Sequence, residues 1–172
     1  MSVRAFLDWL YDAAAYVAAF FLVGTLAMVL LGIAGRLVNW FIPGTDAYAG
    51  YCMAASGFLV LAHTLKRGEH IRVSLLLEHA SERTRHGLEL WSLAVATVLA
   101  GAFAYYGVRL AFQSWQFSDI STANDATPLW IPETGLALGT LILFIAFVDE
   151  FVLELRGARR AMRVPEEVTH HE

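Results

Sequence analysis

Four stretches of the chain run almost free of charged residues, and each is about as long as a lipid bilayer is thick. They cover Ala13–Gly35, Ala47–Leu65, Leu90–Val108 and Ile131–Leu155. A helix needs about 20 apolar residues to cross a hydrocarbon core of ~30 Å, where its backbone polar groups must be bonded internally. The sequence therefore predicts an all-α integral membrane protein with four transmembrane helices, over about 13–35, 47–65, 88–110 and 131–155.

Composition supports this class and excludes several others. The chain is 58% hydrophobic and 16% charged, whereas soluble domains are about 25% charged. A single cysteine, Cys52, excludes a disulfide framework. No phosphate-binding loop, catalytic triad or metal-ligand cluster is recognisable. We therefore expect no enzyme activity, no cofactor and no nucleic-acid partner, and one membrane domain over 1–165 followed by a flexible polar tail, 166–172.

The distribution of basic residues predicts the orientation in the membrane. Lys and Arg gather before the first span, in the segment 66–86 and after the fourth span, whereas only Arg36 and Arg109 border the other two connections. Cytoplasmic loops carry the excess of Lys and Arg. Both termini and the segment 66–86 are therefore predicted to be cytoplasmic, and the segments 36–46 and 110–130 to lie outside.

Turn-forming and small residues predict where helices end and where they pack. Pro43 and Gly44 separate the first two spans, with Asp46 as a candidate N-cap, and Pro132 with Glu133 is typical of a first helical turn. Each span also carries small residues on one face, which allow membrane helices to approach closely. These include Gly24 and Gly32, then Gly50, Ala54 and Gly57, then Ala94, Thr97, Gly101 and Ala104, and a GxxxG pair at Gly135 and Gly139. We expect most of these faces to pack within the bundle and some to meet a partner protein.

The segment between the second and third spans has an amphipathic pattern. Its apolar residues share one helical face and its polar residues the other: Val73, Leu76, Leu77 and Ala80 against Arg72, His79, Glu82 and Arg83. A segment of this kind is too short to span, and it is typical of a helix lying in the membrane interface. We predict an interfacial helix over about 71–80; a plain basic loop is the alternative.

The sequence Thr64–Val73, TLKRGEHIRV, resembles the signature that follows the second span in the small, DctQ-like membrane subunit of TRAP (tripartite ATP-independent periplasmic) transporters. The matching residues are Lys66, Arg67, Gly68, His70, Ile71, Arg72 and Val73. The resemblance extends to Arg36 and Asn39, to the segment IPGTDAYAGY, to the third span and to a Pro-containing segment before the fourth. One departure is that many members have Trp-x-x-Glu before the second helix, where this chain has Thr45-Asp46-Ala47-Tyr48.

The resemblance implies a non-catalytic subunit of a sodium-coupled uptake system in the bacterial inner membrane. In such systems a large membrane subunit carries the solute and sodium sites and moves as an elevator, and an extracytoplasmic binding protein delivers organic acids such as C4-dicarboxylates. The small subunit anchors the large one and helps to dock the binding protein. The expected partners are therefore the large subunit, the solute-binding protein and membrane lipids.

The candidate partner or lipid interface comprises Arg36, Asp46, Lys66, Arg67, Gly68, His70, Arg72, Asp149 and Glu150. Asp149 and Glu150 lie in the cytoplasmic half of the fourth span, and the partners expected for them at the same predicted depth are Lys66, Arg67 or His63. Three roles are open for the two acids: solvation near the headgroups, contact with a partner subunit, or coupling to transport. His70 is a candidate for helix capping, lipid phosphate or a partner.

Two arginines, Arg36 and Arg109, border the segments predicted to lie outside. Arg36 is expected to pair with Asp46 across the turn, and Arg109 to extend its charge toward the membrane surface.

Two rival classes remain to be weighed. A haem-binding anchor needs paired axial ligands inside the bundle, but of the six histidines only His63 falls within a predicted span, which disfavours this class. A four-span anchor or scaffold of another inner-membrane complex is the main alternative. It predicts no companion permease, whereas a TRAP subunit requires one.

Overall fold

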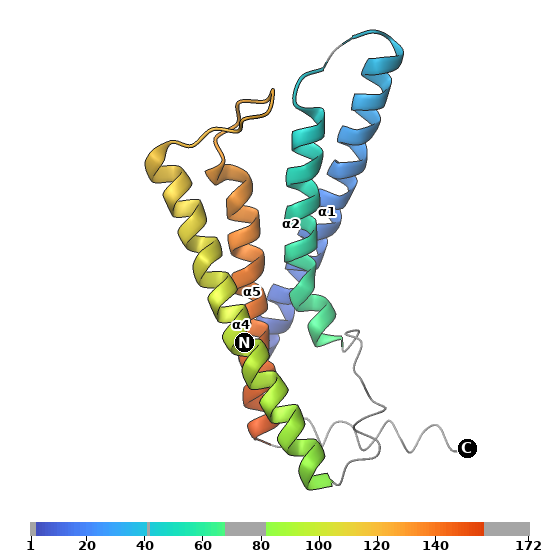
Figure 1. Ribbon diagram of the computed structural model, residues 1–172. Helices are drawn as coiled ribbons and strands as arrows, with labels where there is room; N and C mark the ends of the chain where they lie inside the picture. Colours follow the sequence, from blue (N-terminus) through green and yellow to red (C-terminus); the bar gives the residue numbers. More distant parts are fainter. Residues whose placement is uncertain (1–2, 41, 68–81, 157–172) are drawn as a thin grey trace, which may run out of the picture.

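Four long helices make up almost all of the described chain. The computed structural model describes residues 3–40, 42–67 and 82–156, and forms α1 (Val3–Leu37), α2 (Thr45–Lys66), α4 (Glu82–Phe117) and α5 (Trp130–Leu155) (Figure 1). Each helix is long and apolar enough to cross a membrane. The prediction of an all-α chain with four spanning helices is confirmed. The predicted interfacial helix over 71–80 and the tail 166–172 lie outside the described residues.

The helices extend beyond the predicted spans where no residue breaks them. α2 and α5 agree with prediction to within two residues, but α1 begins at Val3 and α4 runs from Glu82 to Phe117. Neither α1 nor α4 contains a proline, and a polar side chain alone does not end a helix. At 1.5 Å per residue, α4 is about 54 Å long, well beyond a ~30 Å hydrocarbon core.

The helices form two antiparallel hairpins. α1 packs on α2, α4 packs on α5, and contact between α2 and α5 joins the hairpins, so that α1 and α4 lie on the outer sides (Figure 1). The connections 38–44 and 118–129 lie at one end, which we call the loop end. The start of α1, the end of α2, the start of α4 and the end of α5 lie at the other, which we call the terminal end.

Glycines set the distance between the helices. A Cβ atom added at Gly139 of α5 would lie 2.6 Å from the carbonyl carbon of Phe58 in α2, and one at Gly135 would lie 3.0 Å from the Cβ of Ala55. The GxxxG pair therefore forms the contact between the hairpins, as small-residue faces do in membrane bundles. Gly101 of α4 similarly faces the ring of Phe144.

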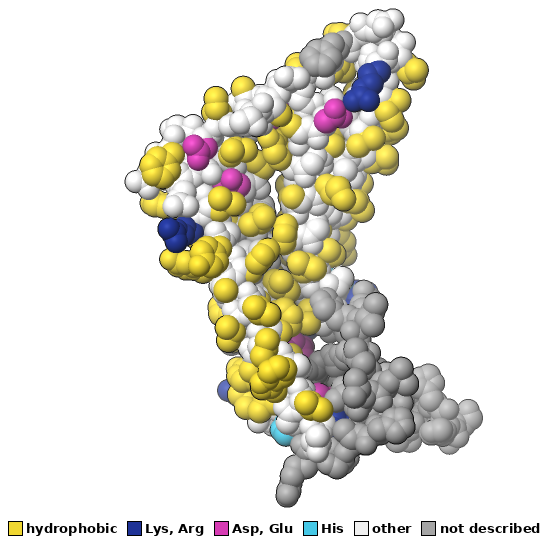
Figure 2. Space-filling model, viewed as in Figure 1, with side chains coloured by type: hydrophobic (Ala, Val, Ile, Leu, Met, Phe, Trp, Pro, Cys, Tyr) yellow, Lys and Arg dark blue, Asp and Glu magenta, His cyan; other side chains and the backbone are white. Residues whose placement is uncertain are grey.

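The outward surface is apolar, as a bilayer requires. Phe20, Val98 and Trp91 are among many large hydrophobic side chains that are mostly exposed, while the buried core holds chiefly alanines. Figure 2 shows hydrophobic side chains along the whole length of the visible face. The most tightly buried apolar cluster contains Tyr11 of α1 and Ala62 of α2, and it lies at the terminal end. The core is thus small, and most apolar side chains face outward.

Candidate functional site

The turn between α1 and α2 places two predicted interface residues together. Arg36, in the last turn of α1, donates from Nη2 to Oδ2 of Asp46, in the first turn of α2, at 3.2 Å. The predicted pairing is confirmed, and both side chains remain largely exposed. The predicted capping role of Asp46 is wrong: the N-cap residue is Gly44, and no side chain caps this end. Asp46 is instead the second residue of α2, where its negative charge interacts favourably with the positive end of the helix dipole.

Gly44 brings the two connections into contact. Its backbone is left-handed, with φ of 81°, which glycine adopts without strain. A Cβ atom at this position would lie 2.8 Å from the Cβ of Asp125 in the connection 118–129. Glycine is therefore needed here both for the turn and for the close approach of the second connection.

The connection 118–129 is ordered by its own backbone. The N–H of Ser121 donates to the carbonyl of Thr127 at 2.8 Å, and the N–H of Leu129 donates to the carbonyl of Asp119 at 2.9 Å. An isolated antiparallel bridge pairs Ile120 with Pro128 between them. The connection therefore returns on itself as a short bonded loop.

Two tyrosines of α2 fasten this loop to the first hairpin. The hydroxyl of Tyr51 lies 3.1 Å from Oδ2 of Asp125 and 2.9 Å from Oγ of Ser121, and the hydroxyl of Tyr48 lies 3.0 Å from Oγ1 of Thr127. Ser121 also donates to Oδ1 of Asp125 at 2.7 Å. We call these five residues the α2–loop junction. Hydrogen bonds from Ser121, and then from Thr127 and Tyr51, lower the pKa of Asp125 below its ordinary value because they stabilise the carboxylate.

Sequence reasoning missed the α2–loop junction. Tyr48 and Tyr51 bond to residues that lie 70 to 79 positions further along the chain. The available signal was the run of short polar residues Ser121–Asp125 beside aromatic hydroxyls at matching depth. A single sequence does not reveal which of them pair.

Charged side chains of α1 and α2 meet at the terminal end. Lys66 forms an ion pair with Asp8, and His63 Nδ1 lies 3.2 Å from Oδ1 of Asp12. The Lys66 ammonium also lies 4.9 Å from the ring centroid of Tyr11, whose side chain is 1% exposed. This distance permits a cation–π contact. The Lys66–Asp8 ion pair, the His63–Asp12 contact and the aromatic contact thus close the first hairpin.

Asp149 and Glu150 of α5 border the same group. Both carboxylates act electrostatically on Lys66 and on Tyr11. Sequence reasoning assigns them Lys66, Arg67 or His63 as partners; Lys66 lies within range of both charges, although its own salt bridge is with Asp8, and His63 lies against Asp12. Because α1 is helical from Val3 onward and packs on α2, its residues Asp8 and Asp12 lie beside Lys66 and His63. Arg67, the third predicted partner, is the C-cap residue of α2. Gly68, His70 and Arg72 lie outside the described residues.

The second hairpin has its own pair at the terminal end. Nδ1 of His86 in α4 lies 2.9 Å from Oε1 of Glu154 in α5, and Glu154 is 1% exposed. The sequence places His86 before a span at 88–110 and leaves Glu154 inside an apolar run, so neither was singled out. A buried carboxylate needs a hydrogen-bonding partner. The available signal was the presence of the acidic Glu154 within the apolar run 131–155.

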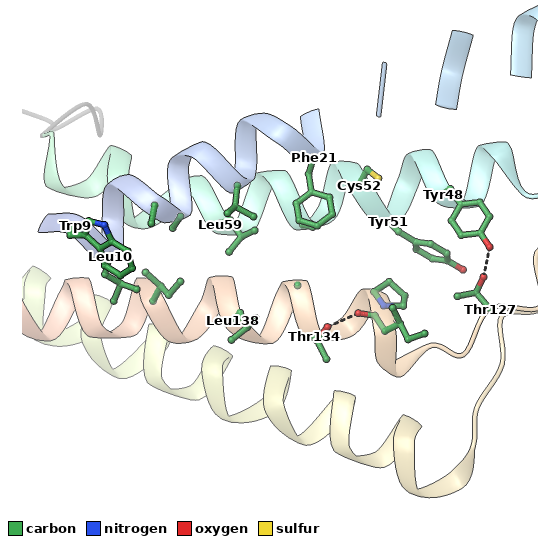
Figure 3. A pocket seen from close by; sticks show the side chains of 18 residues that line it. Trp9, Leu10, Phe21, Tyr48, Tyr51, Cys52, Leu59, Thr127, Thr134 and Leu138 are labelled. Atoms are coloured by element: carbon green, nitrogen blue, oxygen red, sulfur yellow. Dashed lines mark hydrogen bonds between the residues drawn. The ribbon is translucent and has the colours of Figure 1, made fainter. Parts of the chain in front are cut away.

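An apolar groove of about 580 Å³ runs between α1, α2 and α5 (Figure 3). Trp9 and Leu10 lie at its terminal end, Tyr48 and Thr127 at its loop end, and Phe21 lies between them. Its lining is almost wholly apolar, so no polar cluster at mid-depth binds a solute there. Among residues 3–40, 42–67 and 82–156, no group of three or more His, Cys, Asp or Glu side chains is arranged to hold a metal ion.

One side of α2 faces neither α1 nor α5. A Cβ atom added at Gly50 or Gly57 would meet nothing within 4 Å, and Met53 and Ala54 between them are exposed. These four residues recur at positions that share one helical face. We call them the open α2 face. It contrasts with Gly135 and Gly139, whose surroundings are filled by α2.

A family of known proteins matches the chain over most of its length. A search of curated proteins finds no significant match. The family model for the DctQ component of tripartite ATP-independent periplasmic transporters matches residues 25–157. That range contains the Arg36–Asp46 pair, the α2–loop junction, the open α2 face and the His86–Glu154 pair. The chain is a multi-pass membrane protein that belongs to the DctQ family of TRAP transporter components.

Proposed function

We propose that the chain is the small, non-catalytic subunit of a sodium-coupled TRAP uptake system for organic acids such as C4-dicarboxylates. It anchors the large permease subunit in the bacterial inner membrane, with both of its own termini in the cytoplasm. Membership of the DctQ family carries this proposal. The groove between α1, α2 and α5 supports it, because an ion or solute site requires polar groups at mid-depth and the lining there is apolar.

The open α2 face is the proposed contact with the large subunit. Membrane helices associate through small residues that allow backbones to approach. Gly135 and Gly139 perform that role within the chain, whereas Gly50, Ala54 and Gly57 present the same chemistry with no neighbour among the described residues. A helix of the large subunit would complete the contact.

The loop end is the proposed docking surface for the solute-binding protein. The Arg36–Asp46 pair and the α2–loop junction hold the connections 38–44 and 118–129 in one arrangement. A pre-ordered surface loses less conformational freedom when a partner docks. The predicted orientation places this end outside, where the binding protein delivers its solute.

Co-purification from native membranes tests the proposed function. A tagged full-length chain should recover a large multi-span companion and should support uptake of an organic acid only together with it. Recovery of the chain alone, under conditions that preserve other inner-membrane complexes, would contradict the proposal and favour an unrelated anchor. Uptake that is independent of the sodium gradient would contradict sodium coupling while leaving the subunit assignment in place.

A further inference from the structure

Arg109 carries a charge on the apolar outer side of α4. It is exposed and lies eight residues before the end of the helix at Phe117, a distance of about 12 Å along the axis. Within the described ranges, no carboxylate lies within ion-pair distance of it. Arg36 differs, because it is paired with Asp46. Arg109 lies at the outer boundary of the predicted span 88–110, where its charge is available to an anionic group from outside the described chain.

Arg109 also lines a groove between α4 and α5. The groove has a volume of about 530 Å³, and Gly101 and the buried Ala104 leave room beside Tyr105 and Phe112 of α4 and Phe144 of α5. The lining is otherwise apolar, and Arg109 is its one charged member among the described residues. The groove therefore combines a cationic group with an elongated apolar surface.

The order of these features along α4 is that of a phospholipid in one leaflet. Arg109 lies nearer the loop end, and Gly101 lies eight residues deeper, about 12 Å along the helix. A phospholipid places its phosphate near the surface and its acyl chain toward the bilayer centre. A carboxylate from a partner helix would neutralise Arg109 but would leave the groove unexplained.

We propose that the α4–α5 groove binds an anionic phospholipid of the outer leaflet. The guanidinium of Arg109 donates to the phosphate oxygens, and one acyl chain lies over Gly101 against Phe144. Arginine suits this role because its planar fork matches two phosphate oxygens. An anionic headgroup is favoured over a zwitterionic one, since the lining of the groove includes no carboxylate to hold a headgroup amine. The choice of leaflet rests on the proposed orientation; the lipid site itself does not.

Native mass spectrometry of the full chain, titrated with phosphatidylglycerol, tests the site. Arg109→Gln should weaken binding about tenfold or more, consistent with the loss of a charge-assisted hydrogen bond. Arg109→Lys should retain part of the affinity. Val108→Trp should also weaken binding, because it fills the groove from its exposed side and keeps the charge.

Two matched controls separate the site from general effects. Arg85→Gln removes another arginine of α4, one that already pairs with Glu89, and Val98→Trp adds the same ring at an exposed position outside this groove. Both should leave phosphatidylglycerol binding unchanged. Helical content measured by circular dichroism should be the same in all variants.

Three results would overturn the lipid site. Unchanged affinity in Arg109→Gln would show that the charge does not bind the lipid, and unchanged affinity in Val108→Trp would show that the groove does not. Equal affinity for phosphatidylcholine would remove the preference for an anionic headgroup. Loss of the large subunit in Arg109→Gln, with lipid binding intact, would assign Arg109 to a carboxylate of that subunit. Failure of the subunit proposal alone would leave lipid binding unaffected.

Discussion

Replacing Gly139 by alanine should separate the two hairpins. The new Cβ would lie 2.6 Å from the carbonyl carbon, 2.8 Å from the carbonyl oxygen and 2.7 Å from the Cβ of Phe58. Carbon atoms pack best at about 3.5–4.0 Å, so α5 and α2 must move apart by about 1 Å at their closest contact. Two of the three opposing atoms are backbone atoms, so a change of rotamer cannot relieve the contact.

The expected cost is larger than the gain in helix propensity. Overpacking of a close contact costs about 1–3 kcal/mol, and displacement of the whole α2–α5 contact places Gly139→Ala at the upper end. Alanine recovers about 1 kcal/mol as a better helix former than glycine. We therefore expect a net loss of about 1–2 kcal/mol of unfolding free energy, or a Tm decrease of about 2–8 °C for a chain of this size.

Gly57→Ala is the matched control, because a Cβ at Gly57 meets nothing within 4 Å and the helix is the same one that Gly139 contacts. It should leave the Tm of the isolated chain unchanged or slightly raised. Thermal unfolding in detergent, followed by tryptophan fluorescence and circular dichroism, measures both variants. A Tm of Gly139→Ala equal to that of Gly57→Ala would refute the GxxxG contact as the junction of the hairpins.

Three further predictions concern other contacts. Gly57→Leu should leave the Tm of the isolated chain unchanged but reduce co-purification of the large subunit; equal recovery would exclude the open α2 face as the contact. Tyr51→Phe should speed hydrogen exchange at the amides of the loop 118–129, because it removes the donor to Asp125; unchanged exchange would show that the junction does not order the loop. His86→Ala should destabilise the chain by about 2 kcal/mol, since it leaves the buried Glu154 without its partner, and a second change, Glu154→Leu, should restore part of that loss.

The lowered pKa of Asp125 gives the α2–loop junction a defined pH range. Its folded pKa lies below its ordinary value of 3.8, so its stabilising contribution is present above that pH. The contribution is lost as the pH falls through the folded pKa. Exchange in the loop 118–129 should therefore be slow and constant from neutral pH to about pH 5, after correction for the intrinsic rate. Acceleration between pH 7 and pH 5 would contradict this assignment.

The sequence predicts the helices better than it predicts their ends and partners. The apolar runs locate α2 and α5 closely because Pro43 and Gly44 precede α2 and Pro132 lies in the first turn of α5. The starts of α1 and α4 have no such signal. Both helices begin several residues before their apolar runs, so hydropathy alone places their starts too late.

Contacts between distant residues depend on how the hairpins pack. The pairing of Arg36 with Asp46 was predictable because only the short connection between α1 and α2 separates them. Those of His86 with Glu154 and of Tyr51 with Asp125 join positions 68 and 74 residues apart. Local pattern carries no information on which of several polar residues will face each other. For the same reason, sequence alone does not show that Lys66 and His63, besides lying near α5, pair with Asp8 and Asp12 of α1.

The fastening of both ends of the bundle has a mechanical consequence. The α2–loop junction ties the hairpins at the loop end, and contacts between basic and acidic side chains close each hairpin at the terminal end. Sliding one hairpin along the other would have to break the tyrosine hydrogen bonds and drive Phe58 past Gly139 together. The chain therefore resists shear along the membrane normal. A neighbouring domain that moved in that direction would slide past the chain without displacing one hairpin relative to the other.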